Sequence, residues 1–283
     1  MLFRHITHLL SLACLLVGVT TAGPIKKRDA DFESVRTKLD KDHSGKGGDP
    51  RSKYFHESIF HPHYDGRFAG RELTYDEKRE SLPDLVRTYL ATMGNIGAET
   101  WLMHGSLLGW WWNRKIMPWD SDIDVQVSES TIHFLAEYYN MTVFRYKTPS
   151  VPTGKEYMLE VNPRYTIVDI RDKLNVIDAR WTDMDNGLFI DITAVRPNET
   201  ARAEGNAGAL MCKDRHHYQE EDIFPLRDSY FEGMPVKIPY SYAAILEEEY
   251  GKKSLIKTVF QGHRFNQEKK EWEPVRQGFR QHA

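Results

Sequence analysis

Cysteine is scarce in this sequence, with two residues among 283. Cys14 lies in an apolar stretch near the N-terminus, and Cys212 stands alone in the rest of the chain. If the N-terminal stretch is removed, the mature chain has a single thiol and forms no intramolecular disulfide. A metal site built from several cysteines is excluded for the same reason.

The sequence also lacks an excess of positive charge. Its 38 Lys and Arg residues are balanced by 41 Asp and Glu residues, and the formal net charge is -3. Nucleic-acid binding generally needs a clustered basic surface that neutralises phosphates. We therefore expect no nucleic-acid partner. The 40% hydrophobic share is enough for a real core, and the length favours one main domain.

Long apolar runs are missing beyond the first residues. The stretch from Leu9 to Val19 is shorter than the roughly 20 residues that comfortably span a bilayer. It follows Arg4 and precedes the small residues Thr20 to Ala22, so residues 1–22 fit a cleaved secretory signal peptide. A retained signal anchor is the alternative. Either reading places the body of the protein in the lumen of the secretory pathway, such as the Golgi, or outside the cell.

Two short patterns fit that compartment. Asn140 and Asn198 each open an Asn-X-Thr acceptor pattern for N-glycosylation, although chance matches are common. Residues 23–53 are polar and lack an apolar period, which predicts a disordered stem or a propeptide. Residues 54–274 form the expected main domain, whose irregular first part carries His56, His61 and His63 in packing or surface roles. Residues 275–283 are a polar tail.

The coarse pattern is that of an α+β domain with a mixed β-sheet flanked by helices. Helical periodicity begins after Thr74 and runs to about Ile96, and Gly251 is the expected stop of a last helix. Residues 262–283 look like a polar surface extension. Further elements are expected as strands at 100–103, 122–127, 157–161, 176–181 and 188–195, as helices up to Asn113, from 129 to about 139 and at 242–250, and as an Asn-Gly hairpin turn at 185–187.

Asp122 and Asp124 are the first candidates for chemistry. Residues two apart on a strand point to the same face, so these carboxylates project together while Ile123 and Val125 face the core. Two carboxylates on one face repel each other unless a cation lies between them. Mg²⁺ or Mn²⁺ is the natural occupant because hard divalent ions prefer carboxylate oxygens. Taken alone, a D-x-D pattern more often marks a solvated acidic edge.

The surrounding sequence favours a metal site over a solvated acidic edge. Gly105 and Ser106 lie upstream between an expected strand and a short helix, where backbone N–H groups and the Ser106 hydroxyl can hold a phosphate. A strand, a Gly-Ser turn, a helix and then D-x-D is the order found in the nucleotidyltransferase fold. That fold needs a third carboxylate from a neighbouring strand, and Asp191 supplies it within GLFIDITAV. The predicted triad is therefore Asp122, Asp124 and Asp191.

The sequence resembles the LicD family, which includes bacterial phosphocholine transferases and fukutin-type ribitol-phosphate transferases. The resemblance covers about residues 54–274, and within the family the chain looks closest to fungal proteins linked to mannosylphosphate transfer. It rests on four stretches, HGSLLGWWWNRKIMPWDSDIDVQV, ARWTDMDNGLFIDITAV, CKDRHHYQEEDIFPLRDSYFEGMPVKIPYSYAAILEEEYG and GHRFNQEKKEWEP.

The resemblance implies a phosphodiester-forming transferase with a nucleotide-linked donor, such as GDP-mannose or a CDP-alcohol, and a glycan acceptor. It assigns donor phosphate to Gly105 and Ser106, and metal to the three aspartates. Asp120 matches the first acid of the family's PWDxDxD run, where an indirect or structural role is favoured over direct ligation.

Three other residues near the motif have two readings each. Arg114 and Lys115 either neutralise donor phosphate or are solvated surface charges. His104 either hydrogen-bonds near the phosphates or is structural, because it lies at the end of a buried strand.

Three functions fit these residues. The first is metal-dependent transfer of a sugar-phosphate, most plausibly mannose-phosphate, to glycoprotein or cell-wall glycans. The second is a non-catalytic regulator or subunit that recruits or stabilises a partner glycosyltransferase. The third is a secreted nucleotidyltransferase with a small-molecule acceptor, which the scarcity of nucleoside triphosphates outside the cytosol disfavours. Phosphocholine and ribitol-phosphate are the alternative groups for transfer.

Overall fold

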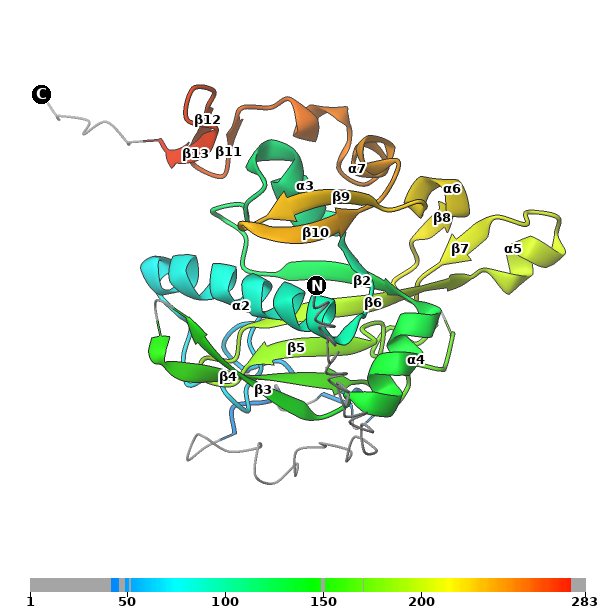
Figure 1. The fold of residues 1–283 in the computed structure, drawn as a ribbon, viewed down its shortest axis with the longest axis horizontal. Coiled ribbons are helices and arrows are strands. Elements are labelled where there is room, and N and C mark those ends of the chain that lie inside the picture. Colours follow the sequence, from blue (N-terminus) through cyan, green and yellow to red (C-terminus); the bar gives the residue numbers. More distant parts are fainter. Residues whose placement is uncertain (1–41, 46–48, 51, 149–150, 170, 276–283) are drawn as a thin grey trace, which may run out of the picture.

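A mixed β-sheet of ten strands forms the centre of the computed structural model (Figure 1). The structure describes residues 42–45, 49–50, 52–148, 151–169 and 171–275, so the expected signal peptide and residues 276–283 lie outside the described residues. The ten strands are β1 (Thr100–Leu102), β2 (Ile123–Ser128), β3 (Thr142–Thr148), β4 (Val151–Val161), β5 (Ala179–Asp183), β6 (Phe189–Pro197), β7 (Ala209–Met211), β8 (His217–Gln219), β9 (Arg227–Phe231) and β10 (Met234–Ile238).

The strand order is β3-β4-β5-β6-β2-β1-β10-β9, and β7 and β8 extend the sheet from β6. The β2–β6 and β1–β10 pairs are parallel, while the other pairs along this path are antiparallel. The helices are α2 (Tyr75–Ile96), α3 (His104–Asn113), α4 (Glu129–Tyr138), α5 (Glu199–Ala203), α6 (Glu220–Ile223), α7 (Tyr242–Tyr250) and the short 3₁₀ helix η1 (Lys252–Leu255). The expected fold class, a mixed sheet flanked by helices, is confirmed.

Helix α2 covers the centre of the sheet (Figure 1). It begins where predicted because Thr74 caps it: the Thr74 side chain accepts from the Glu77 N–H, and the Glu77 carboxylate accepts from the Thr74 N–H. It ends at Gly97, which adopts a left-handed conformation with φ 72°. Tyr89 of α2 packs edge-on against Trp181 of β5 within the main hydrophobic cluster. Burial of this apolar face holds the helix on the sheet.

The turn between β5 and β6 follows the predicted Asn-Gly pattern. The Asp183 carboxylate accepts from the N–H of Asp185 and from the side-chain amide of Asn186. Gly187 adopts φ 79°, and the backbone oxygen of Asp65 lies so near that a Cβ on Gly187 would approach it to 2.6 Å. The β5–β6 hairpin is therefore built around a residue that must have no side chain.

Segment 52–73 packs against the body of the domain. Tyr64 forms a β-bridge with Leu188 and is fully buried, as is Ala69. Described residues of the expected stem are also attached, since His43 donates its N–H to the Gly66 oxygen and Gly45 donates to the Glu57 oxygen, each at 2.9 Å. His43 and Gly45 are therefore part of the folded domain.

The C-terminal region corrects one expectation. Residues 262–274 do not form a polar surface extension: with β11 (Val259–Phe260), strands β12 (His263–Asn266) and β13 (Glu271–Pro274) form a three-stranded antiparallel sheet. Phe265 and Trp272 are buried there against Met117. Strands β12 and β13 each offer one large apolar residue to this cluster, so the local pattern is too weak to reveal a strand without its distant partner.

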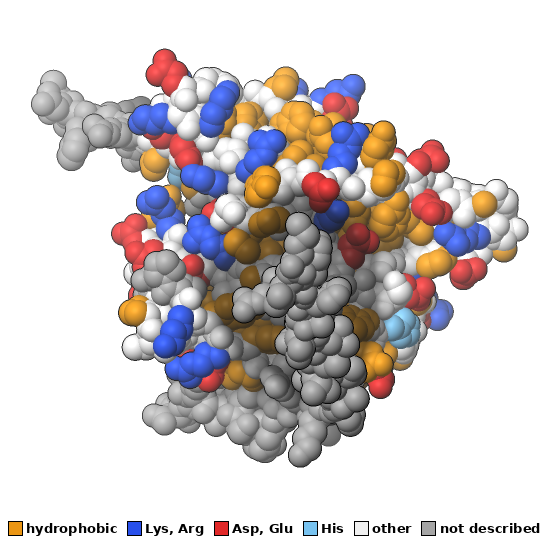
Figure 2. All heavy atoms as spheres, in the orientation of Figure 1, with side chains coloured by type: hydrophobic (Ala, Val, Ile, Leu, Met, Phe, Trp, Pro, Cys, Tyr) orange, Lys and Arg blue, Asp and Glu red, His pale blue; other side chains and the backbone are white. Residues whose placement is uncertain are grey.

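Other parts of the sheet have no clear signal in the sequence. The pattern of residues does not predict strands β3, β9 and β10: β9 is short and largely polar, and β10 is short and contains a proline. On the face drawn in Figure 2, acidic and basic side chains are interspersed, and hydrophobic side chains gather near α7 and β9. Within the described residues, no helix is both long enough and apolar enough to cross a membrane.

Gly187→Ala tests the packing of the β5–β6 turn. A left-handed alanine costs about 1–2 kcal/mol, and overpacking against Asp65 adds about 1–3 kcal/mol. Gly233→Ala is the matched control, because Gly233 has φ 80° and a Cβ added there would meet nothing within 4 Å. Chemical denaturation should show a clearly larger loss for Gly187→Ala. Equal losses for the two variants would contradict the close contact.

Candidate functional site

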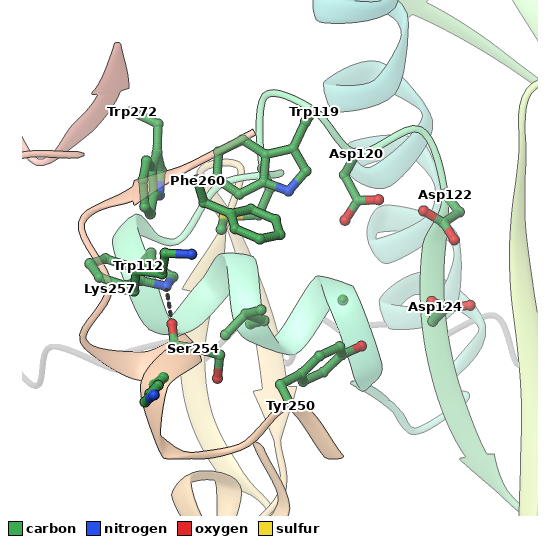
Figure 3. Close-up of a pocket in the computed structure, with 14 residues that line it drawn as sticks. Trp112, Trp119, Asp120, Asp122, Asp124, Tyr250, Ser254, Lys257, Phe260 and Trp272 are labelled. Atoms are coloured by element: carbon green, nitrogen blue, oxygen red, sulfur yellow. Dashed lines mark hydrogen bonds between the residues drawn. The ribbon is translucent and has the colours of Figure 1, made fainter. Parts of the chain in front are cut away.

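Parallel pairing of β2 and β6 brings two of the predicted acids together. Asp124 and Asp191 are Cα partners in the register, so their side chains start from neighbouring positions on one face of the sheet. Asp122 and Asp120 lie just before β2, which begins at Ile123, one residue later than predicted. Asp120, Asp122 and Asp124 line one side of a cavity of about 460 Å³, as Figure 3 shows. Asp191 stands beside Asp124 but outside the residues that line this cavity.

Gly105 and Ser106 lie in the first turn of α3, because the helix already begins at His104. Gly105 lines the cavity, and a Cβ at this position would approach the Asp120 carboxylate to 3.1 Å. The absence of a side chain keeps the backbone of the helix start open to a ligand. Ser106 is buried, and its Oγ accepts from the Asp124 N–H at 2.9 Å. The hydroxyl therefore ties the start of α3 to the acidic strand.

The acids in the cavity carry more negative charge than their surroundings balance. Burial raises the pKa of Asp124 to about 8, and the charges of Asp122 and Asp191 oppose its ionisation further, against the attraction of His104. Burial and the neighbouring Asp122 likewise raise the pKa of Asp120. Burial alone would raise the pKa of Asp122, but a hydrogen bond with Asp120 and the charge of His63 lower it. Of the two carboxyl groups, Asp120 is therefore the one that its surroundings favour in the protonated form.

A divalent cation fits this set of side chains. The facing groups are carboxylates, which are the ligands that Mg²⁺ and Mn²⁺ prefer, and their mutual repulsion would be relieved by a cation between them. His63, which the sequence indicated as a packing or surface residue, brings its Nδ1 to 3.7 Å from Asp122 Oδ2. It partly balances the charge of Asp122 at the rim.

Arg180 of β5 is an unpredicted partner of the third acid. Its Nε donates to Asp191 Oδ1 at 2.7 Å, and its terminal nitrogen donates to Glu57 at 2.9 Å. The guanidinium is buried and stacks on Phe189, 3.8 Å from the ring centroid. Burial raises the pKa of Asp191, and Arg180 opposes that rise. Glu57 and Asp191 are far apart in sequence, so their sharing of one arginine left no local signal.

The opposite side of the cavity is aromatic and basic (Figure 3). Trp119 lies within 5.3 Å of Phe260 and 4.9 Å of Trp272, measured between ring centroids. Lys253 and Lys257 also line the cavity, from the segment between α7 and β11. Sequence reasoning missed this wall because Phe260 and Trp272 lie more than a hundred residues from the D-x-D motif and reach it through the C-terminal sheet.

The tryptophans of α3 divide between core and cavity. Trp110 is buried and donates its Nε1–H to Ser229 Oγ, while Trp111 donates to the Leu255 oxygen. Trp112 donates to the Ser254 oxygen and lines the cavity. Three consecutive residues on a helix point in different directions, so the three tryptophans have different surroundings.

The structure does not bring Arg114 and Lys115 into the acidic cavity. Arg114 caps α3 in a left-handed conformation, with its guanidinium 5.4 Å from the Trp110 ring centroid. Lys115 forms an ion pair with Glu271 and lines a neighbouring groove of about 860 Å³. Of the two readings of these residues, the fold favours surface and capping contacts, because the end of α3 points away from Asp122 and Asp124.

The two acceptor asparagines make side-chain contacts within the fold. Asn140 Oδ1 accepts from the Val161 N–H at 2.9 Å, and Asn198 Oδ1 caps α5 by accepting from the Ala201 N–H. Both side chains are partly exposed. Glycosylation at either residue stays a prediction.

His104 forms polar contacts away from the cavity. Its Nδ1 lies 2.8 Å from Glu249 Oε1, and its Nε2 lies 3.5 Å from Asp214 Oδ2. Burial alone would lower the pKa of His104, but the neighbouring carboxylates of Asp214 and Glu249 raise it to about 10. His104 therefore contacts Glu249 and Asp214, neither of which lines the cavity.

Arg180→Met tests the buried partner of Asp191. Removing one member of a buried ion pair costs roughly 3–5 kcal/mol because the other charge is left uncompensated. Arg171→Met is the control, since Arg171 makes an exposed ion pair with Asp169 and its loss should leave the unfolding midpoint unchanged. If Asp191 also contacts a metal, Mn²⁺ should restore part of the stability of Arg180→Met but not of Arg180→Met with Asp191→Asn. An unchanged midpoint in Arg180→Met would contradict the pairing.

Asp124→Asn should raise the thermal midpoint of the metal-free protein. The folded-state pKa of Asp124, about 8, lies above the value in the unfolded chain, so its contribution to stability is lost as pH rises toward 8. Asparagine does not titrate, so the gain of the variant over wild type should grow between pH 5 and pH 8. The variant should also lose the stabilisation that Mn²⁺ gives wild type. Asp228→Asn, at an exposed surface pair, should show neither change in differential scanning fluorimetry.

Comparison with known proteins agrees with this geometry. The family model for the LicD/FKTN/FKRP nucleotidyltransferase domain matches residues 97–241, which include the start of α3, the D-x-D strand and Asp191. In Saccharomyces cerevisiae, mannosyltransferase regulator 4 is 33% identical over 136 residues, covering 47% of this chain and 11% of that protein. Mannosyltransferase regulator 14 is 32% identical over 177 residues, covering 57% of this chain and 19% of that protein. The chain thus spans a small part of these relatives' length. Since the family model matches half of the sequence, the chain belongs to the LicD family.

Proposed function

We propose that this protein transfers a sugar-phosphate, most plausibly mannose-phosphate, from a nucleotide-sugar to glycoprotein or cell-wall glycans. One observation carries the proposal: Asp120, Asp122 and Asp124 face an aromatic and basic wall across a single cavity. A nucleotide-sugar carries a flat base, a diphosphate and a sugar, and the cavity offers a matching surface for each.

The donor would lie with its base against the aromatic wall and its diphosphate toward the acids. Trp119, Phe260 and Trp272 supply flat faces for stacking, and Lys253 and Lys257 supply positive charge for phosphate oxygens. The open backbone of Gly105 at the start of α3 offers N–H groups to the same phosphates. Asp122 and Asp124 would hold Mg²⁺ or Mn²⁺, which when bound neutralises the diphosphate and the leaving group.

The acceptor glycan would approach from the neighbouring groove. This groove of about 860 Å³ shares Met117, Trp119, Asp120 and Trp272 with the donor cavity, so the two meet at the acids. An acceptor hydroxyl oxygen would form a bond to the phosphorus that carries the sugar. The bond from that phosphorus to the bridging oxygen would break, and the nucleoside monophosphate would leave. The hydroxyl proton would pass to a carboxylate, for which Asp191 beside Asp124 is the candidate.

The relatives' names favour a second candidate function. Both yeast proteins are named as mannosyltransferase regulators, so this domain would act as a non-catalytic regulator or subunit of a mannosylphosphate transferase. The same names support a place in the secretory pathway, where glycans are mannosylated. The intact acidic cluster supports catalysis instead, because a purely regulatory domain has no need of three mutually repelling carboxylates. Phosphocholine and ribitol-phosphate stay alternatives for the transferred group.

A turnover assay separates the two functions. Purified protein is incubated with Mn²⁺, a panel of GDP- and CDP-linked donors and a mannan acceptor, and released nucleoside monophosphate is measured. We expect release with a GDP-sugar that needs the acceptor. Asp122→Asn should reduce the rate at least 100-fold through loss of metal binding, whereas Asp228→Asn at an exposed surface pair should not change it.

The opposite result identifies a regulator. If wild type and Asp122→Asn are equally inert in the assay, yet both restore mannosylphosphate to a yeast strain that lacks its own regulators, the proposed transfer reaction is wrong.

A further inference from the structure

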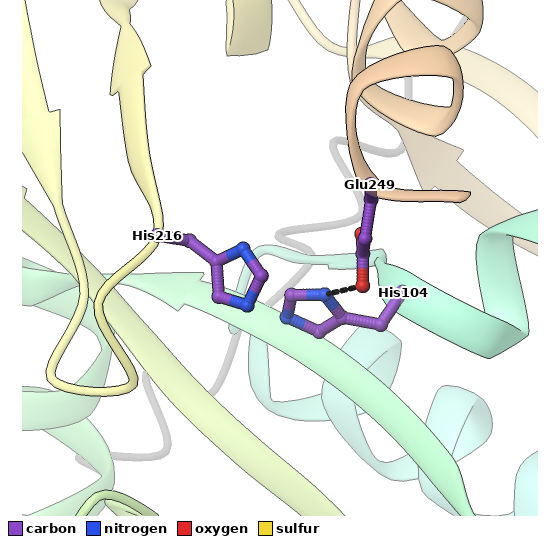
Figure 4. A group of neighbouring side chains, drawn as sticks. All are labelled: His104, His216 and Glu249. Atoms are coloured by element: carbon purple, nitrogen blue, oxygen red, sulfur yellow. Dashed lines mark hydrogen bonds and ion pairs between the residues drawn. The ribbon is translucent and has the colours of Figure 1, made fainter. Parts of the chain in front are cut away.

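A second cluster of metal-binding side chains lies behind the acidic cavity, where three segments meet. His104 opens α3, Asp214 and His216 lie in the turn between β7 and β8, and Glu249 lies near the end of α7. Figure 4 shows both imidazole rings and the Glu249 carboxylate pointing toward one another. One ligand atom from each of His104, His216 and Glu249 lies within 4.8 Å of the others.

The orientation of His104 is set by a hydrogen bond. Glu249 Oε1 accepts a hydrogen bond from Nδ1 at 2.8 Å, which orients the ring so that Nε2 points toward Asp214 on the other side. Nε2 is buried and has no hydrogen-bond partner among the described residues. A buried nitrogen without a partner is unfavourable unless something else satisfies it.

The surroundings of Nε2 supply two more ligands. Asp214 Oδ2 lies 3.5 Å from His104 Nε2 and 3.9 Å from His216 Nε2, so the carboxylate faces both rings. The two imidazole rings have centroids 4.5 Å apart. Two imidazoles and a carboxylate are a donor set that zinc-class ions bind in proteins. The Glu249 carboxylate contacts the far nitrogen of His104, which is the usual supporting contact of a metal-binding histidine.

We propose that His104, His216 and Asp214 bind a zinc-class divalent ion, with Glu249 holding the His104 ring in place. This site is distinct from the acidic cavity, whose facing groups are carboxylates and suit a hard ion such as Mg²⁺ or Mn²⁺. The proposal does not depend on turnover, so it holds for a transferase and for a regulator alike.

The ion would fasten the start of α3 to two other segments. His104 adopts φ 50°, a left-handed conformation that is uncommon for a residue with a side chain and needs support from its surroundings. Gly105, next in sequence, lines the acidic cavity, and Asp124 lies between the cavity and His104. A link between α3, the β7–β8 turn and α7 would therefore hold the phosphate-facing turn in register with the acids.

Metal content is the first test. The full chain is purified without chelator, and its metals are measured by inductively coupled plasma mass spectrometry. We expect about one equivalent of zinc per chain. After removal with chelator, Co²⁺ added with excess Mg²⁺, which occupies the acidic cavity, should restore one equivalent and produce visible d–d absorption typical of nitrogen and oxygen ligands. Failure of the wild-type chain to bind either ion stoichiometrically would overturn the proposal and leave His104 as a protonated partner of Asp214 and Glu249.

Matched variants locate the ion. His216→Ala should abolish the Co²⁺ spectrum and the rise in melting temperature that Zn²⁺ gives, and the half-exposed position of His216 keeps the fold intact in this variant. Glu249→Gln should weaken Co²⁺ affinity about 10- to 100-fold. His217→Ala, at the neighbouring exposed histidine, and Asp122→Asn, in the acidic cavity, should bind Co²⁺ as wild type does. Loss of the spectrum in Asp122→Asn, or its retention in His216→Ala, would show that the ion binds elsewhere.

Discussion

The parallel pairing of β2 with β6 is the constraint on which the rest of the site depends. It places Asp124 beside Asp191 on one face of the sheet, while Ile123, Val125, Ile190 and Ile192 are buried on the other. A slip of one residue would exchange these faces and put carboxylates into the core. The energy of core packing therefore specifies the position of the acids, and the acids themselves oppose folding through their mutual repulsion.

The fold balances that repulsion unevenly. Arg180 neutralises Asp191 from within the sheet and is in turn held by Glu57 of the N-terminal segment. No described basic residue makes a comparable direct ion pair with Asp120 or Asp124. The acids nearest the cavity thus keep the strongest tendency to take up a proton or a cation. Asp191 is thus ion-paired within the sheet, whereas Asp120 and Asp124 face the cavity without such a partner among the described residues.

The far wall of the cavity comes from the opposite end of the chain. Strands β11 to β13 close over α3 because Phe265 and Trp272 pack against Met117 and Trp112. The same packing that buries these rings presents Trp119 and Phe260 to the cavity (Figure 3). The small sheet therefore contributes to stability and to the ligand surface at once.

Local sequence by itself determined the elements that have strong periodicity or a clear cap. The helix after Thr74, the D-x-D strand, the Asn-Gly turn before Leu188 and the helix ending at Gly251 all follow from contacts within a few residues. The sequence also indicated Asp191 as a companion of Asp124, because the nucleotidyltransferase fold needs a third carboxylate from a neighbouring strand. Sheet register then placed them side by side.

Only the tertiary structure decided which residues from distant parts of the chain contact one another at the site. Arg180 joins Glu57 to Asp191, Trp272 folds back onto α3, and His104 meets His216 and Glu249 across three segments. Each of these contacts depends on the packing of elements that are far apart in the chain, and single residues in short or polar strands carry no local signal of where they will lie. For the same reason the start of α3, predicted as a phosphate turn, also lies beside His216 and Glu249, a contact that no local pattern indicated.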